Sequence, residues 1–199
     1  NTQTNRILAN VSAGLNIYKG LNYKLNVSTD QTRATRKVTQ DAQLSYMTDK
    51  GTAAINNVEL GSSMIENYLT YDLNLNETNR FNFLAGHSYQ KFRIYTYGLS
   101  ATGFASGDVD NLNDLSLGKY TQATISSDVT VNELQSFFGR VNYTLMDKYL
   151  VTVNFRADGS TKFGKNNKYG YFPSTALAWS MNEEGFIKSI GISNYQESQ

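Results

Sequence analysis

The chain has 199 residues, among them 14 Tyr, 10 Phe, one Pro and no Cys, which excludes disulfides and thiolate metal sites and favours strands. Its 18 basic and 17 acidic residues give a net charge of +1, so the composition predicts no nucleic-acid partner. The sequence contains no run of 18 or more apolar residues and therefore no candidate transmembrane helix.

The first predicted element is a β-hairpin near the start of the chain. Apolar and polar residues alternate over 7–17, the sequence Tyr-Lys-Gly at 18–20 predicts a tight turn, and alternation resumes over 21–28. Alternate side chains of a strand point to opposite faces, so this pattern gives each strand one apolar and one polar face. The polar stretch 29–63 that follows is predicted to be a long loop.

A second hairpin follows, with a second polar stretch behind it. Alternation over 68–75 leads to a turn at 77–79, and the returning strand runs from Phe81 to about Tyr97. The segment 102–132 contains several Gly, Asp and Asn residues and is predicted to be the next long loop.

The third hairpin has the clearest pattern. Strands are predicted over 137–145 and 149–156, joined by a turn at 146–148. A polar loop over 158–173 and a strand over 174–181 follow, and 182–188 is predicted to form one helical turn.

The predicted connections alternate in length along the chain. Short turns follow every second strand and long polar stretches follow the others, which places all long loops at one end of the sheet. Outer-membrane barrels have short periplasmic turns and long extracellular loops. The sequence therefore predicts an all-β, antiparallel transmembrane β-barrel with about seven or eight strands in this chain. A complete small barrel is the alternative that the strand number alone leaves open.

Several motifs in the last third resemble a known family. They are the segments 136–143 (SFFGRVNY), 147–150 (DKYL), 156–164 (RADGSTKFG), 166–174 (NNKYGYFPS), 178–179 (AW) and 182–186 (NEEGF). In this order they resemble SusC/RagA-type TonB-dependent outer-membrane transporters of Bacteroidetes. The segment 5–90 resembles the preceding barrel hairpins more loosely, as in 83–90 (FLAGHSYQ).

The resemblance implies a role in nutrient import across the bacterial outer membrane. It implies that residues 1–199 are part of a barrel of roughly 22 strands with a plugged lumen, and that the plug domain and the TonB box are absent from these residues. The implied partners are a SusD-like surface lipoprotein, the TonB-ExbB-ExbD system acting through the missing plug, a glycan or peptide substrate, and outer-membrane lipid.

Six residues are candidates for contacts with substrate or plug. Arg140, Asn142, Arg156 and Asp158 alternate with apolar residues and are expected to face the lumen, where charges need partners. Their alternative role is scaffolding of the barrel wall. Tyr169 and Tyr171 are expected either to stack on substrate rings or to belong to an aromatic girdle at the membrane surface.

No catalytic, cofactor or metal site is predicted. His87 is the only histidine, and its neighbour Ser88 points to the opposite face of a strand, which disfavours a hydrolase. Residues 108–114 carry Asp and Asn at a spacing that partly resembles a calcium loop, but the glycine and glutamate of that motif are missing. A structural or adhesive barrel and, less favoured, an outer-membrane hydrolase remain the alternative functions.

Overall fold

The computed structural model describes residues 1–40, 51–104, 113–119, 123–164 and 168–185. Its strands are β1 (Thr2–Tyr18), β2 (Leu21–Gln40), β3 (Thr52–Asn74), β4 (Asn79–Thr102), β5 (Thr124–Leu145), β6 (Tyr149–Ser160) and β7 (Tyr169–Trp179). Two 3-10 helices, η2 (Leu115–Leu117) and η4 (Met181–Glu183), complete the described elements. None of the described helices has the length and hydrophobicity that a membrane span requires.

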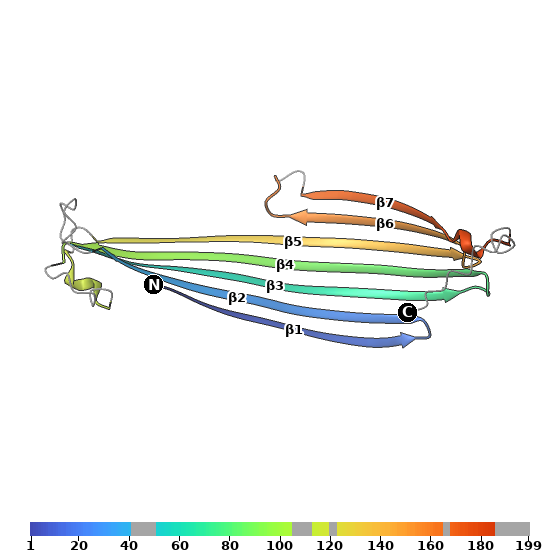
Figure 1. Ribbon diagram of the computed structural model, residues 1–199, viewed down its shortest axis with the longest axis horizontal. Coiled ribbons are helices and arrows are strands. Elements are labelled where there is room, and N and C mark those ends of the chain that lie inside the picture. Colours follow the sequence, from blue (N-terminus) through green and yellow to red (C-terminus); the bar gives the residue numbers. More distant parts are fainter. Residues whose placement is uncertain (41–50, 105–112, 120–122, 165–167, 186–199) are drawn as a thin grey trace, which may run out of the picture. The chain divides into compact units, whose positions relative to one another are not determined.

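The seven strands form one sheet in which sequence order equals spatial order, from β1 to β7 (Figure 1). Strands β5, β6 and β7 pair antiparallel, for example Val141 with Val153 and Val153 with Thr175. The sheet of the described residues is open, with β1 and β7 at its edges. The predicted all-β antiparallel fold and the predicted number of strands are confirmed.

The long loops were predicted with bounds that are too wide. Strand β2 continues to Gln40 and β3 begins at Thr52, so most of 29–63 is strand. Strand β4 ends at Thr102, where the loop 102–132 was predicted to begin, but β5 already begins at Thr124. Strand β6 continues to Ser160 and β7 begins at Tyr169, both inside the predicted loop 158–173. The backbone ladder that defines a strand needs no apolar face, so a strand continues where both of its faces are polar.

The helical turn predicted over 182–188 is described only in part. The 3-10 helix η4 covers Met181–Glu183, Gly185 is also helical, and 186–188 lie outside the described residues.

The chain divides into two compact units. The first comprises Asn1–Asn10, Ser28–Ser63 and Gln90–Asn132. Its small core contains Ala53, Ala101 and Phe104, against which Leu115 packs. Ion pairs join its neighbouring strands, with 2.6 Å between Arg6 and Asp30 and 2.8 Å between Arg33 and Glu59.

The second unit comprises Val11–Val27, Met64–Tyr89 and Glu133–Gln199 and contains the three tight turns. Backbone hydrogen bonds link each turn region to a neighbouring strand or turn: Asp72 donates to Gly20 (2.8 Å), Met146 to Thr78 (2.7 Å) and Ser180 to Lys148 (2.7 Å). The ends of the hairpins are thereby held in register with one another.

Strands β5 and β6 are joined by a turn with two residues in the left-handed region. Met146 and Asp147 have φ of 53° and 58°, and the Lys148 N–H donates to the Leu145 carbonyl at 3.0 Å. These features define a type I′ turn, whose twist matches that of the flanking strands. Such turns usually contain Asn-Gly, but here Asp147 forms an ion pair with Arg80 of β4.

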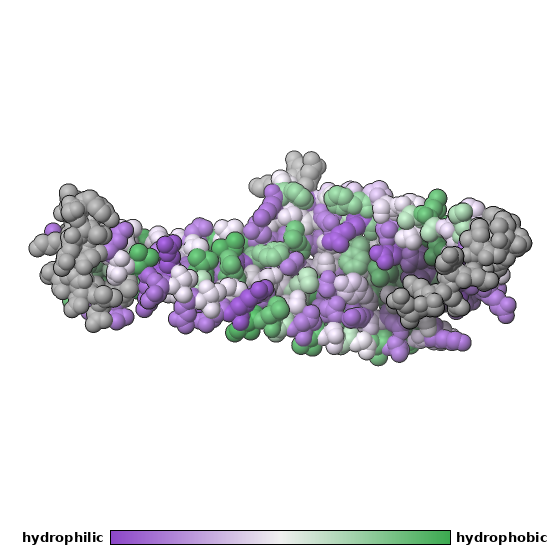
Figure 2. Space-filling view, in the orientation of Figure 1, coloured by the Kyte–Doolittle hydropathy of each residue, from purple (hydrophilic) through white to green (hydrophobic). Residues whose placement is uncertain are grey.

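Few apolar side chains of the described residues are buried. They are Ala53, Ala101, Phe104 and Ala157, whereas many large apolar residues of the strands are exposed, such as Leu15 (62%) and Leu177 (77%). Figure 2 shows hydrophobic residues at the surface among hydrophilic ones. The described sheet therefore does not enclose a dry core of the size that a soluble domain requires.

A substitution of Gly20 tests the packing of the first tight turn. We expect Gly20→Ala to destabilise the fold by at least about 1 kcal/mol, because a side chain is strained at its φ of +82° and the added Cβ would lie 2.4 Å from the Asp72 carbonyl oxygen. Urea unfolding of the receptor that carries this segment measures the effect. Gly164→Ala is the control because a Cβ there has no neighbour within 4 Å, and an equal loss in both variants would contradict the expectation.

Candidate functional site

The strand register of unit 2 sorts the side chains onto two faces of the sheet. One face, here called the apolar face, consists of every second residue of each strand. It contains Phe137, Val141, Tyr143, Val151, Val153, Phe155, Tyr171 and Leu177. The other face, here called the polar face, consists of the residues in between. It contains Arg140, Asn142, Thr152, Asn154, Arg156, Asp158 and Ser174. Because side chains alternate, every residue of these strands belongs to one face.

A row of hydrogen bonds crosses four strands on the polar face. Asn82 of β4 donates to Asp72 of β3 at 2.7 Å, and Asn142 of β5 donates to the Asn82 carbonyl at 3.1 Å. Thr152 of β6 then donates to the Asn142 carbonyl at 2.9 Å. Each side-chain amide acts as donor to one strand and acceptor from the next, so the polar groups of the row satisfy one another.

A second row continues the pattern to β7. The Arg140 Nε–H donates to the Asn154 carbonyl at 2.8 Å, and the Asn154 amide donates to Ser174 Oγ at 3.2 Å. Among the described residues, Asn154 is the only polar partner of Arg140. Its guanidinium therefore has no carboxylate partner in the described sheet.

Arg156 is held more firmly than Arg140. Its Nε–H donates to both carboxylate oxygens of Asp158, at 2.7 and 2.9 Å, and Nη2 donates to the buried Ser136 at 3.2 Å. The guanidinium also lies 5.7 Å from the centre of the Phe138 ring. A cation over an aromatic face is attracted by the ring quadrupole, so Phe138 and Asp158 fix Arg156 together.

The Phe138 ring occupies space that a glycine leaves free. A Cβ on Gly86 of β4 would lie 2.1 Å from Phe138 Cε2. The ring also contacts Tyr68 of β3, with 5.6 Å between ring centres. An aromatic side chain of β5 thus lies across β4 and reaches β3 on the polar face.

These residues surround a groove of about 430 Å³ on the polar face. It is lined by Leu84, Phe138, Gly139, Arg140, Asn154, Phe155, Arg156, Phe172, Pro173 and Ser174. The lining includes two arginines and no carboxylate, while Phe138 and Phe172 supply aromatic surface. The groove can accept a ligand with both a negative or hydrogen-bonding group and an apolar part.

The structure brings together four of the six residues selected from the sequence. Arg140, Asn142, Arg156 and Asp158 share the polar face, whereas Tyr169 and Tyr171 lie on the apolar face of β7, away from the groove. Tyr171 stacks on Phe155, with 6.1 Å between ring centres. Phe138 and Phe172 also line the groove but were not selected as site residues. The alternation placed Phe138 on the same face as Arg140, whereas Phe172 fell in the predicted loop 158–173, where no face could be assigned.

Aromatic residues also gather beside the tight turns. Tyr149 and Trp179 stack with their ring centres 6.3 Å apart, and both donate to Glu184 Oε1, at 2.7 and 3.2 Å. Lys148 donates to Glu184 Oε2 at 3.1 Å. The hydrogen bond from Tyr149, followed by those from Lys148 and Trp179, lowers the pKa of Glu184 below its usual range.

The described structure gives no support for a catalytic or metal site at the other two candidates from the sequence, His87 and the segment 108–114. His87 contacts Gln135 (3.1 Å), and its ring packs tilted against Phe137, with 4.8 Å between ring centres. The described residues contain no group of three side chains suited to a metal. Within the segment 108–114 that partly resembles a calcium loop, 108–112 lie outside the described residues, and Asp114 caps η2 by accepting from the Ser116 N–H.

Comparison with known proteins identifies relatives for most of the chain. It is 36% identical over 150 residues to TonB-dependent receptor P26 of Formosa agariphila, and 42% identical over 127 residues to TonB-dependent receptor P3 of the same organism. It is 49% identical over 63 residues to TonB-dependent receptor SusC of Bacteroides thetaiotaomicron. The chain spans only 15%, 12% and 6% of these relatives, and the matches cover 75%, 64% and 32% of the chain.

A solved structure has the same fold. The RagAB peptide transporter matches with a TM-score of 0.85 and 24% identity, over 100% of this chain and 21% of that chain. No family model matches the sequence. The resemblance to SusC/RagA-type TonB-dependent transporters that the motifs predicted is confirmed, and the open sheet corresponds to part of such a barrel.

The contact of Gly86 with Phe138 leads to a compensation test. Gly86→Ala should destabilise the barrel by about 1–3 kcal/mol through overpacking, and adding Phe138→Leu should restore part of this loss by making room for the methyl group. Urea unfolding of the single and double variants measures the coupling. Gly14→Ala is the control because its Cβ would meet nothing closer than 3.9 Å; strict additivity of the two changes would contradict the expectation.

The lowered pKa of Glu184 predicts a pH dependence. Its ionised form contributes stability above the usual carboxyl pKa of about 4.3, and this contribution is lost as the pH falls through the lowered pKa of the folded state. The thermal midpoint of wild type should therefore exceed that of Glu184→Gln at pH 7. The difference should shrink on acidification below about pH 4, and a difference independent of pH would contradict this role.

Proposed function

Since the chain is similar to SusC/RagA-type TonB-dependent receptors, we propose that residues 1–199 form part of the wall of an outer-membrane barrel that imports a nutrient. The apolar face contacts lipid and the polar face lines the lumen. This proposal depends on the difference between the two faces of unit 2. One face exposes large apolar side chains, and on the other the polar groups are joined in hydrogen-bonded rows.

The two faces fit the two environments of a barrel wall. Apolar side chains such as Val153 (48% exposed) and Leu177 (77% exposed) are unfavourable in water but favourable against acyl chains. The polar face offers charged and amide groups to a water-filled passage. Backbone groups inside a bilayer must all be paired, so the edge strands β1 and β7 require neighbours that close the barrel.

We propose that the import depends on parts outside these residues. A plug domain with a TonB box occupies the lumen and receives energy through TonB-ExbB-ExbD, and a SusD-like lipoprotein delivers the substrate at the cell surface. The substrate is an oligosaccharide or a peptide. The positively charged groove around Arg140 and Arg156 supports contacts with carboxylates, either of a peptide or of acidic plug residues.

An experiment with cysteine labels tests both the faces and the transport. The chain has no Cys, so Ser174→Cys on the polar face and Thr175→Cys on the apolar face each introduce a single thiol in this segment. In cells that express the complete receptor with any other cysteines removed, a water-soluble maleimide should modify the first variant and spare the second.

Labelling should also affect uptake. A bulky maleimide at position 174 should reduce uptake of a fluorescent oligopeptide or a fluorescent malto-oligosaccharide, while treatment of the neighbouring variant should leave it unchanged. The substrate whose uptake falls identifies the transported class. Equal labelling at both positions would refute the assignment of the faces, and unchanged uptake of both substrates after complete labelling would refute the import path.

A further inference from the structure

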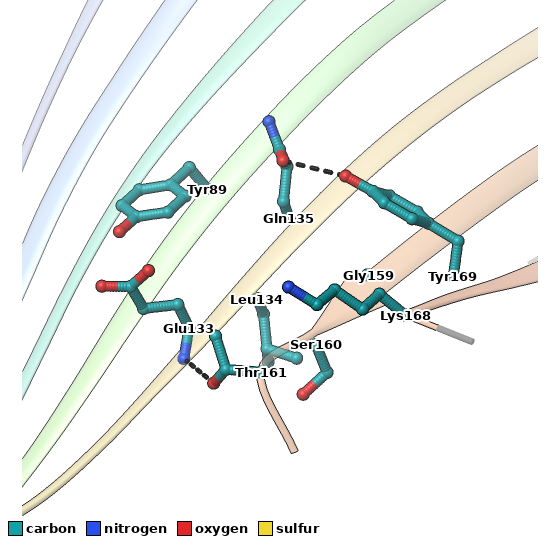
Figure 3. A pocket seen from close by; sticks show the side chains of 9 residues that line it. All are labelled: Tyr89, Glu133, Leu134, Gln135, Gly159, Ser160, Thr161, Lys168 and Tyr169. Carbon is teal, nitrogen blue, oxygen red and sulfur yellow. Dashed lines mark hydrogen bonds between the residues drawn. The ribbon is translucent and has the colours of Figure 1, made fainter. Parts of the chain in front are cut away.

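A polar pocket of about 220 Å³ interrupts the apolar face of unit 2 at the end of β6 remote from the tight turns (Figure 3). Its lining comes from β4, β5, β6 and β7 and from the residues that flank the last two strands: Tyr89, Glu133, Leu134, Gln135, Gly159, Ser160, Thr161, Lys168 and Tyr169. The function proposed above gives this pocket no role.

The wall of the pocket is fixed by a glycine and two hydrogen bonds. The Tyr169 ring lies over Gly159, where a Cβ would be 2.7 Å from ring atom Cε1. Across this gap the Tyr169 hydroxyl donates to Gln135 Oε1 at 3.0 Å, and Gln135 Nε2 lies 3.1 Å from His87 Nε2. Because β6 has no side chain at this point, one ring from β7 reaches β5.

The position of the pocket along the strands matches a membrane boundary. The 11 residues of β7 run from Tyr169 at the pocket to Trp179 beside the tight turns, which is about 33 Å at ~3.3 Å per residue. With a strand tilt of about 40°, this length corresponds to a height of about 25 Å, the thickness of the apolar band of outer-membrane barrels. If Trp179 marks the inner boundary, Tyr169 lies at the outer one.

The chemistry of the lining favours a neutral ring that carries hydroxyl groups. Figure 3 shows the Tyr89 and Tyr169 rings on opposite sides of the pocket, with Gln135 between them. The Lys168 amine points toward the middle of the pocket, and the Glu133 carboxylate lies near Tyr89. A carboxylate in the lining disfavours an anion, while amide, hydroxyl and ammonium groups bind hydroxyls. Aromatic faces supply apolar contact. The volume is below the ~300 Å³ of sites for drug-sized ligands, so a single ring fits best.

We propose that this pocket binds one sugar ring of a glycolipid in the outer leaflet of the outer membrane. The proposal rests on the membrane location proposed above, which places the pocket at the level of lipid headgroups. A free saccharide carries the same chemistry, so the experiment must separate the two sources.

The test uses the complete receptor in nanodiscs of phosphatidylethanolamine that contain a monoglucosyl diacylglycerol. After extraction into a sugar-free detergent, native mass spectrometry measures the glycolipid retained per receptor. Tyr169→Leu and Gly159→Ala should each lower retention about three- to tenfold, which corresponds to the loss of one or two hydrogen bonds. Tyr171→Leu is the matched control, because Tyr171 lies on the same face but stacks on Phe155.

The outcomes separate this proposal from the import function. Equal retention by wild type and all variants would refute the pocket, as would equal retention of diacylglycerol without the sugar. Binding of free methyl glucoside to lipid-free receptor with no preference for the glycolipid would refute the lipid source. If the Ser174→Cys and Thr175→Cys variants label as expected but the receptor retains no glycolipid, only the glycolipid proposal is refuted. A receptor absent from the outer membrane instead refutes the import function.

Discussion

Pairing of backbone groups between neighbouring strands is the constraint on which this structure depends. A strand has no internal hydrogen bonds, so each N–H and C=O needs a partner on an adjacent strand, and in lipid no water can replace it. The order β1 to β7 and the bonds between the tight turns satisfy this requirement from strand to strand. Because the side-chain period is two, the same pairing divides the residues between two faces.

The polar face shows how a wall of this kind keeps its polar groups satisfied. An unpaired buried polar group costs about 1–3 kcal/mol, and the partly buried bonds of Asn142 reduce this cost. The exposed row through Asn154 repeats the same alternation of donor and acceptor across strands. The side-chain N and O atoms that are buried in the described structure all have partners. Arg140 departs from this pattern, because no described carboxylate balances its charge, and this makes it the residue of the groove best suited to an external anion.

Two glycines give the sheet its aromatic contacts. Gly86 on the polar face and Gly159 on the apolar face each lie beneath a ring from another strand, Phe138 and Tyr169 respectively. A side chain at either glycine would displace the ring, so the missing Cβ allows a contact that extends beyond adjacent strands. The first contact positions Arg156, and the second forms the wall of the polar pocket.

The sequence by itself determined the hairpins, their tight turns and the two faces, because alternation in 137–145 and 149–156 dictates which side chains share a face. It thereby placed Arg140, Asn142, Arg156 and Asp158 together. Only the tertiary structure decided where the strands end: in 29–40 polar residues occupy nearly all positions of both faces, so hydrophobic alternation is lost although β2 continues to Gln40. It alone decided the contacts of Phe138 and Tyr169, because a ring that crosses a glycine depends on the register between strands distant in sequence, which no local pattern encodes.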